Sequence, residues 1–161
     1  MPKYLQRIDA LGLALPEPLI LPPGVVLPFA FVNVRGDRAY ISGHGPQNTD
    51  GSLAGPFGAV GTEVTPEQAY ESARKTGLSI LGSLHRELGD LDRIIGWGRV
   101  LGMVKCANGF SATPGVINGF TDLILDVFGP EVGRHARSAV GMEVLPFDIP
   151  VEIEAEVHIV E

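Results

Sequence analysis

The segment Val151–Val160 has the clearest alternation of apolar and polar positions in the chain. Because successive side chains of a strand point to opposite faces, this pattern predicts a half-buried strand with its apolar face toward helices. The apolar positions are Val151, Ile153, Ala155, Val157 and Ile159, and the polar ones are Glu152, Glu154, Glu156 and His158. The preceding segment, His135–Pro146, predicts a second, mostly apolar strand with the guanidinium of Arg137 beside Ser138 near its start.

Two other segments carry apolar residues at helical spacing. The first begins at Thr65–Gln68, where a threonine can cap the helix, a proline suits the first turn and a glutamine can complete a capping box. Gly89 is its expected end. The second helix is predicted to begin at Thr113-Pro114, to bury a wide apolar stripe and to end at Gly129-Pro130.

The remaining apolar runs predict three more strands. Phe29–Arg35 and Ala39–Ser42 flank Gly36-Asp37, which is typical of a hairpin turn. Arg93–Cys106 is apolar on both sides, as expected of a central strand. The order strand–strand–helix–strand–helix–strand–strand predicts an α+β sandwich, with one mixed or antiparallel sheet and two helices on one face.

An N-terminal extension is predicted over residues 1–26, followed by one domain over residues 27–161. The extension contains a short helix over residues 4–12 and an extended, proline-rich arm over residues 13–28, because the residue before a proline disfavours helix. Two interpretations of the arm stay open. It packs along a surface such as a subunit interface, or it is a loosely ordered leader.

Charge and composition limit the kinds of partner that the chain is expected to bind. The 12 Lys and Arg residues are scattered and the net charge is −7, whereas nucleic-acid binding needs clustered basic residues, so no nucleic-acid partner is expected. Prolines and Glu17 interrupt the apolar stretch Ala10–Val34, which argues against a membrane span. One cysteine, Cys106, and no clear signal peptide indicate the cytoplasm. The four histidines lack metal-ligand spacing, so neither a metal nor another cofactor is predicted.

Four motifs together resemble the RidA/YjgF family, also called L-PSP endoribonucleases or translation inhibitors, of which this chain would be a divergent member. They are Ser42-Gly43 with the following Pro46, Ala136–Ser138, Leu145-Pro146 and Val151–Ala155. Their order and spacing are more specific than any one of them. The resemblance implies the family's chorismate-mutase-like fold, assembled as a homotrimer with sites in the clefts between subunits.

The resemblance also implies roles for individual residues. Arg137 matches the arginine that binds the carboxylate of a small imine or enamine acid, and the planar fork of a guanidinium suits this task. Glu152 matches the residue that orients the hydrolytic water, for which burial must raise its pKa. Ser42 and Gly43 match a pair whose main chain lines the cleft, and Asn118 matches an asparagine near it.

Each assignment has a plainer interpretation. Arg137 could pair with a glutamate across an interface, and Glu152 could be an ordinary solvent-facing strand residue. A final hairpin that turns near Leu145-Pro146 would bring these two residues together, whereas a later turn would separate them by several residues at about 3.3 Å each. His135 precedes Arg137 by two residues and is either a surface histidine or a border of the cleft.

Two positions depart from the family pattern. Phe29 stands where active deaminases usually carry a tyrosine, and Ala139 stands where a cysteine is usual. Both changes make the expected pocket more apolar. The sequence therefore leaves two main hypotheses: a deaminase that hydrolyses 2-aminoacrylate-like acids to keto acids and ammonia, and a protein that binds or senses small carboxylates without turnover. A third, the endoribonuclease of the older family label, is disfavoured by the acidic charge and the lack of a histidine pair.

Overall fold

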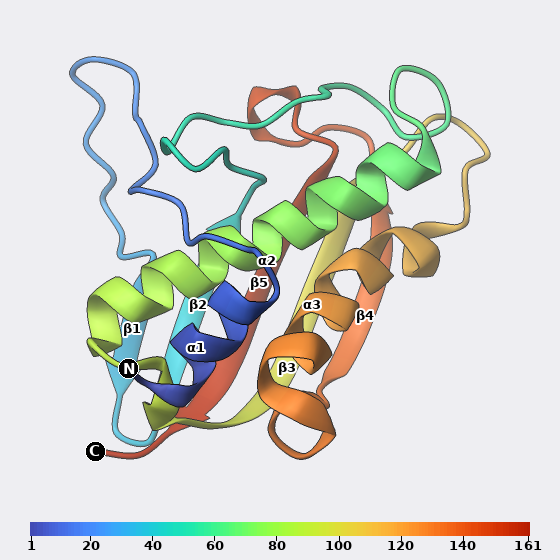
Figure 1. Ribbon diagram of the computed structural model, residues 1–161. Helices are drawn as coiled ribbons and strands as arrows, with labels where there is room; N and C mark the ends of the chain where they lie inside the picture. Colours follow the sequence, from blue (N-terminus) through green and yellow to red (C-terminus); the bar gives the residue numbers. More distant parts are fainter.

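The computed structural model describes residues 1–161, which form one mixed five-stranded sheet with helices on one face (Figure 1). The predicted α+β class and the predicted order of strands and main helices are confirmed. The elements are α1 (Lys3–Ala10), β1 (Val32–Arg35), β2 (Arg38–His44), α2 (Pro66–Leu88), β3 (Ile94–Lys105), α3 (Thr113–Gly133), β4 (Ala136–Met142) and β5 (Val151–Ile159). No helix is long and apolar enough to cross a bilayer.

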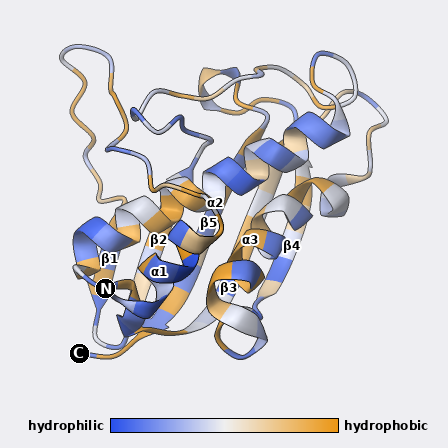
Figure 2. Cartoon of the chain, in the orientation of Figure 1, coloured by the Kyte–Doolittle hydropathy of each residue, from blue (hydrophilic) through white to orange (hydrophobic).

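The sheet order is β1-β2-β5-β3-β4, and every neighbouring pair is antiparallel except β3 and β4. The alternation predicted for β5 is confirmed, because Val151, Ile153 and Val157 are fully buried beneath the helices. Figure 2 shows the same alternation as changes of colour along the strands. β3 is a central strand, as its two-sided apolar pattern predicted.

The prediction that the last two strands form a hairpin is wrong. β4 runs parallel to β3 at one edge of the sheet, because α3 forms the crossover between them. The chain then passes through a short 3-10 turn at Pro146–Asp148, and β5 inserts between β2 and β3. The strands that carry Arg137 and Glu152 are therefore not neighbours.

The predicted helix signals are confirmed with small shifts. The hydroxyl of Thr65 accepts a hydrogen bond from the backbone N–H of Gln68 at 3.1 Å, and the Gln68 side chain accepts from the Thr65 N–H at 2.9 Å. Gly89 follows α2 with φ +76°, which favours glycine. In α3, Gly129 has φ +75° and breaks the helix where predicted, before a last helical turn that reaches Gly133.

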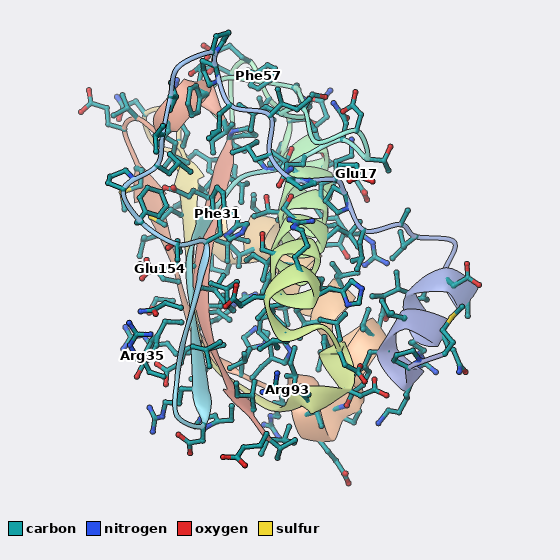
Figure 3. The ribbon with its side chains drawn as sticks, turned by 90° about the vertical axis from the view of Figure 1, so that its left-hand side faces the viewer. Glu17, Phe31, Arg35, Phe57, Arg93 and Glu154 are labelled. Atoms are coloured by element: carbon teal, nitrogen blue, oxygen red, sulfur yellow. The ribbon has the colours of Figure 1, made fainter.

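The N-terminal segment lies along the body of the molecule. Tyr4 of α1 packs its ring 4.3 Å from that of Phe128 in α3, centroid to centroid. The arm that follows is extended, and the backbone N–H of Glu17 donates to the carbonyl of Thr49 at 3.0 Å. The arm therefore covers the loop that leaves β2, and Figure 3 shows Glu17 on the helix side of the molecule.

Candidate functional site

Arg137 lies on β4 opposite Val100 of β3 and faces α3. Its guanidinium donates to the hydroxyl of Thr121 at 2.8 Å and to the carbonyl of Pro114 at 3.1 Å. The three ion pairs of the chain, Arg38–Glu156, Arg74–Asp126 and Lys105–Asp148, do not include it. Neutral acceptors thus fix the cation and leave its charge uncompensated within the chain.

His135 completes a hydrogen-bond relay behind this guanidinium. Its Nδ1 lies 2.8 Å from the carbonyl oxygen of Gly133, which can only accept, so Nδ1 carries the proton. Nε2 then accepts from the Thr121 hydroxyl at 3.0 Å, and that hydroxyl oxygen receives Arg137. Burial lowers the pKa of His135, and Arg137 lowers it further, against the opposing effect of the Gly133 bond. His135 is half-buried, and its hydrogen bond with the Thr121 hydroxyl helps to hold the acceptor of Arg137 in place.

Asn118 and Ala139 lie at the same edge of the molecule. Pro114, Asn118 and Thr121 recur at helical spacing and share one face of α3, so exposed Asn118 lies between the two helix groups that receive Arg137. Ala139 follows Arg137 by two residues and shares its strand face. We call Arg137, Asn118 and Ala139 the α3–β4 half-site.

The other site residues gather around β2 and β5. Ile41 pairs with Ala155 and His44 with Ile153, so Ser42 and Gly43 form a bulge opposite Glu154 alone. Phe29 precedes this region and is 53% exposed, and the Ser42 hydroxyl donates to the carbonyl of Ala30 at 2.7 Å. Phe29, Ser42 and Gly43 therefore lie close together at the end of the sheet that contains β1 and β2.

The side chain of Glu152 lies directly over the bulge. A Cβ added at Gly43 would come within 2.6 Å of its Oε1, so a larger residue at this position would push the carboxylate away. Burial raises the pKa of Glu152, and the neighbouring charge of Glu154 raises it further. We call Glu152, Gly43, Ser42 and Phe29 the β2–β5 half-site.

The two half-sites lie on opposite faces of the sheet in one chain. Arg137 is level with Val100, which is buried beneath the helices, whereas Glu152 is level with Met103 and lies on the outer face. Figure 3 views the sheet from its β1 edge and shows Glu154 on the side of the sheet away from the helices. A single chain therefore does not bring Arg137 and Glu152 together, contrary to the hairpin expectation.

A hollow of about 650 Å³ opens on the outer face beside the β2–β5 half-site. It is lined by Phe29, Ser42, Tyr40, Arg99 and Glu154, among others. Arg137 does not reach it. No group of three or more His, Cys, Asp or Glu side chains is placed to hold a metal ion.

Sequence reasoning missed Thr121 and Pro114 as partners of Arg137. Thr121 follows Pro114 by seven residues, which is two helical turns, so the two share a helix face. That spacing was visible in the sequence. The pairing of this face with β4 was not, because it depends on the parallel crossover.

Several known proteins are similar to this chain. Protein TCP17 of Trypanosoma cruzi is 38% identical over 124 residues, which is 77% of this chain and 76% of that protein. Protein Atu1372 of Agrobacterium tumefaciens, whose function is unknown, is 34% identical with a TM-score of 0.85, over 98% of this chain and 92% of that one. A candidate endoribonuclease of Shewanella oneidensis is 25% identical with a TM-score of 0.87, over 98% and 99%. No model of a known protein family matches the chain.

The single mixed sheet with helices on one face defines the YjgF-type α+β fold. The Rid-family protein YyfA of Yersinia pestis shares it with a TM-score of 0.59 at 21% identity, over 85% of this chain and 92% of that one. The chain belongs to the RidA/YjgF family.

Proposed function

We propose that this protein hydrolyses small reactive enamine or imine acids, such as 2-aminoacrylate, to keto acids and ammonia. We place the reaction in clefts between the subunits of a cytoplasmic homotrimer. The observation that carries the proposal is the guanidinium of Arg137, which neutral acceptors hold in place and no carboxylate of its own chain neutralises.

Arg137 anchors the substrate through its carboxylate. A guanidinium has five N–H donors, and only two hydrogen bonds engage those of Arg137 within the chain. The remaining donors match the two oxygens of a carboxylate in the bidentate geometry that favours arginine over lysine. Because Thr121 and Pro114 fix the fork in advance, little conformational entropy is lost when the acid binds.

Glu152 activates the water. An enamine first tautomerises to the imine, whose carbon is already electrophilic. Water adds to this carbon while Glu152 takes one of its protons and passes it to the imine nitrogen, which becomes an amino group. The hydroxyl proton of the resulting carbinolamine then moves through Glu152 to the amino group, and ammonia leaves as the C=O bond forms. A raised pKa suits this role, because it makes the carboxylate a stronger base toward water and the carboxyl group can then return the proton.

Assembly of the subunits brings Arg137 of one copy close to Glu152 of another. Since the two half-sites face opposite sides of one sheet, a site containing both needs the α3–β4 edge of one copy to meet the outer face of another. A closed ring of three copies repeats this head-to-tail contact three times. The mixed polarity of the outer face, with Arg35, Arg99, Glu154 and Glu156 beside Tyr40, is compatible with such contact.

The decisive experiment generates 2-aminoacrylate in the presence of the protein and follows keto-acid release. The wild type is expected to accelerate release, and Arg137→Ala is expected to abolish the acceleration while keeping its fold. Arg134→Ala is the matched control, because this exposed arginine lies three residues earlier and makes no hydrogen bond or ion pair within the chain. Absence of acceleration by the wild type would refute the deaminase proposal.

Phe29 and Ala139 support a second candidate, a protein that binds a small carboxylate without turnover. Neither side chain can polarise a substrate, and both make the cleft more apolar. Calorimetric titration with pyruvate separates the two functions, because saturable binding that Arg137→Ala abolishes, without release of keto acid from 2-aminoacrylate, supports the binding function alone. An Arg137→Ala variant that binds as well as the wild type would remove both candidates.

A further inference from the structure

A buried histidine at the end of β2, His44, has a full set of hydrogen-bond partners that the proposed chemistry does not use. It is 4% exposed. Its Nδ1 lies 2.6 Å from the carbonyl oxygen of Ser42, and its Nε2 lies 2.9 Å from the hydroxyl oxygen of Ser83 in α2. Arg86 donates to that hydroxyl at 3.2 Å and to the carbonyl of Pro16 in the N-terminal arm at 3.0 Å.

The direction of each hydrogen bond follows from these partners. The Ser42 carbonyl only accepts, so Nδ1 of His44 carries the proton. In the neutral ring Nε2 accepts, and the Ser83 hydroxyl therefore donates to it. The Ser83 oxygen in turn receives the N–H of Arg86, which has no acceptor atom. One arrangement of protons therefore satisfies the His44 ring, the Ser83 hydroxyl and the Ser42 carbonyl.

A charged His44 would break this arrangement. Both ring nitrogens would then donate, and the Ser83 hydroxyl would lose the acceptor of its hydrogen. The pKa of His44 is lowered to about 4, chiefly by burial and also by the charge of Arg86, with the bond to Ser42 acting against both. The histidine is thus neutral at the pH of the cytoplasm.

The relay ends at the bulge of the β2–β5 half-site. A bulge frees peptide groups from the regular ladder, so their orientation depends on other contacts. The His44 ring holds the Ser42 carbonyl and with it the plane of the Ser42–Gly43 peptide. That peptide sets the position of Gly43, over which the Glu152 carboxylate lies.

We propose that His44 is a positioning residue, whose neutral ring, fixed by Ser83 and Arg86, holds the Ser42–Gly43 bulge against Glu152. The arm takes part because the Pro16 carbonyl fixes Arg86. The effect on turnover rests on the proposed function, whereas the effect on the Glu152 carboxyl group does not. The two can therefore fail separately.

The first measurement is ¹⁵N NMR of the histidine rings in the intact wild-type protein. His44 is expected to show a protonated Nδ1 and an unprotonated Nε2, without titration between pH 8 and about 5. The His44 signals are assigned by their loss in His44→Asn. A ring with its proton on Nε2, or one that titrates near 6.5, would overturn the proposal.

The second measurement is the pKa of Glu152, followed by ¹³C NMR of its carboxyl group. His44→Phe keeps the ring but loses both bonds, and the bulge is expected to relax, so that the pKa of Glu152 falls toward its usual value. His44→Asn keeps an N–H donor at the position of Nδ1 and is expected to retain the raised pKa. Thr76→Val, which removes another buried hydroxyl of α2, is the control for lost stability alone.

The outcomes separate positioning from a purely structural role. If folded His44→Phe leaves the pKa of Glu152 unchanged, or if Thr76→Val lowers it equally, the proposal is wrong. If His44→Phe does not fold, Ser83→Ala provides the test: the Ser42 carbonyl keeps the proton on Nδ1, but Nε2 loses its donor, so the ring is held less firmly and the pKa of Glu152 is expected to fall part of the way toward its usual value. An unchanged pKa of Glu152 in folded Ser83→Ala would then refute the relay.

Activity provides a further arm if the protein is a deaminase. His44→Phe is expected to lower kcat roughly 10- to 100-fold with little change in KM, because water activation is misplaced while the carboxylate anchor is intact. His44→Asn is expected to recover most of the loss. Full kcat in His44→Phe would refute the positioning role.

Discussion

Arg137 and Glu152 are prepared for their proposed tasks by opposite electrostatic means. Arg137 keeps its charge because a hydroxyl and a carbonyl hold it without neutralising it. Glu152 is pushed toward its neutral form by burial and by Glu154. The two residues also depend on neighbours from other elements, because Thr121 of α3 holds Arg137 and Gly43 of β2 leaves room for the carboxylate of Glu152.

Thr121→Val is expected to weaken carboxylate binding. Valine has nearly the shape of threonine but cannot accept from Arg137 or donate to His135, so the guanidinium loses its fixed orientation. Loss of a hydrogen bond to a charged group corresponds to roughly tenfold weaker affinity. Calorimetric titration with pyruvate measures the change, with Thr76→Val as the control. Unchanged affinity in Thr121→Val would show that Arg137 needs no support from α3.

Glu152→Gln is expected to raise stability at neutral pH while abolishing turnover. The pKa of Glu152 is raised on folding, so its contribution to stability is complete below the unfolded value near 4.5 and is lost as pH rises through the raised folded value. Glutamine carries no charge, so Glu152→Gln does not lose this stability as the pH rises. Because the side chain is only half-buried, the gain at pH 7 is below about 1 kcal/mol.

Denaturant titrations at several pH values test whether Glu152→Gln is more stable than the wild type at neutral pH. The stability difference between Glu152→Gln and wild type is expected to shrink as pH falls and to vanish in acid. Glu161→Gln at the exposed C-terminus is the control and is expected to show no such trend. A variant that is less stable than wild type at pH 7 would contradict the raised pKa.

At the scale of elements, α2 and α3 pack closely because two glycines let their backbones approach. A Cβ at Gly77 would come within 2.6 Å of Leu123, and a Cβ at Gly119 would come within 2.0 Å of the carbonyl oxygen of Tyr70. This close packing holds α3 in the position from which Thr121 and Pro114 reach Arg137. The geometry of the α3–β4 half-site therefore depends on a crossing of small residues that do not themselves hydrogen-bond the guanidinium.

Gly119→Ala and Gly115→Ala form a matched pair on α3 with opposite expected effects. At Gly119 the new methyl group meets backbone that cannot rotate away, which costs about 1–3 kcal/mol or more. At Gly115 nothing lies within 4 Å, and alanine gains about 0.5–1 kcal/mol from its helix propensity. Thermal unfolding measures both. Equal effects at the two positions would contradict the close crossing.

At the scale of the whole molecule, the division of the site residues between two faces is the main constraint on function. One copy presents the guanidinium of Arg137 at the β4 edge and the carboxylate of Glu152 on the outer face of the sheet. For the proposed reaction, neither half-site is sufficient alone. The proposed activity is therefore a property of the assembly, and measuring the mass in solution tests the proposed trimer directly.

Mixing Arg137→Ala and Glu152→Gln subunits is expected to restore activity that neither variant has alone. In a head-to-tail ring each site takes Arg137 from one copy and Glu152 from the next, so random mixing of equal amounts regenerates about a quarter of the sites. The subunits are unfolded together, refolded and assayed for keto-acid release. Two Arg137→Ala preparations mixed in the same way are the control. No recovery, despite proven subunit exchange, would place both residues of a site in one copy.

Much of the fold was predictable because it depends on local chemistry. The capping box at Thr65–Gln68, the break at Gly129 and the alternation of β5 are decided by side chains within a few residues of one another. Strand ends were less certain. Phe29–Phe31 were expected in the first strand but precede β1, and β2 continues through its bulge to His44.

The pairing of the last strands could not be predicted in this way. A hairpin and a parallel crossover satisfy the same alternation of side chains, and only the packing of α3 against the sheet selects the second. His44 shows the same limit, because its neighbours in sequence do not reveal the Ser83 and Arg86 side chains of α2 that fix its ring.

The sequence by itself determined the elements, the buried face of β5 and the family motifs that single out Arg137 and Glu152. These depend on residue type and spacing, which can be read directly from the sequence. Only the tertiary structure decided that the two residues face opposite sides of the sheet, since strand order arises from packing between segments far apart in sequence. The same packing aligns each hydrogen-bond relay, because an arginine, a hydroxyl, a histidine and a carbonyl must meet from separate elements.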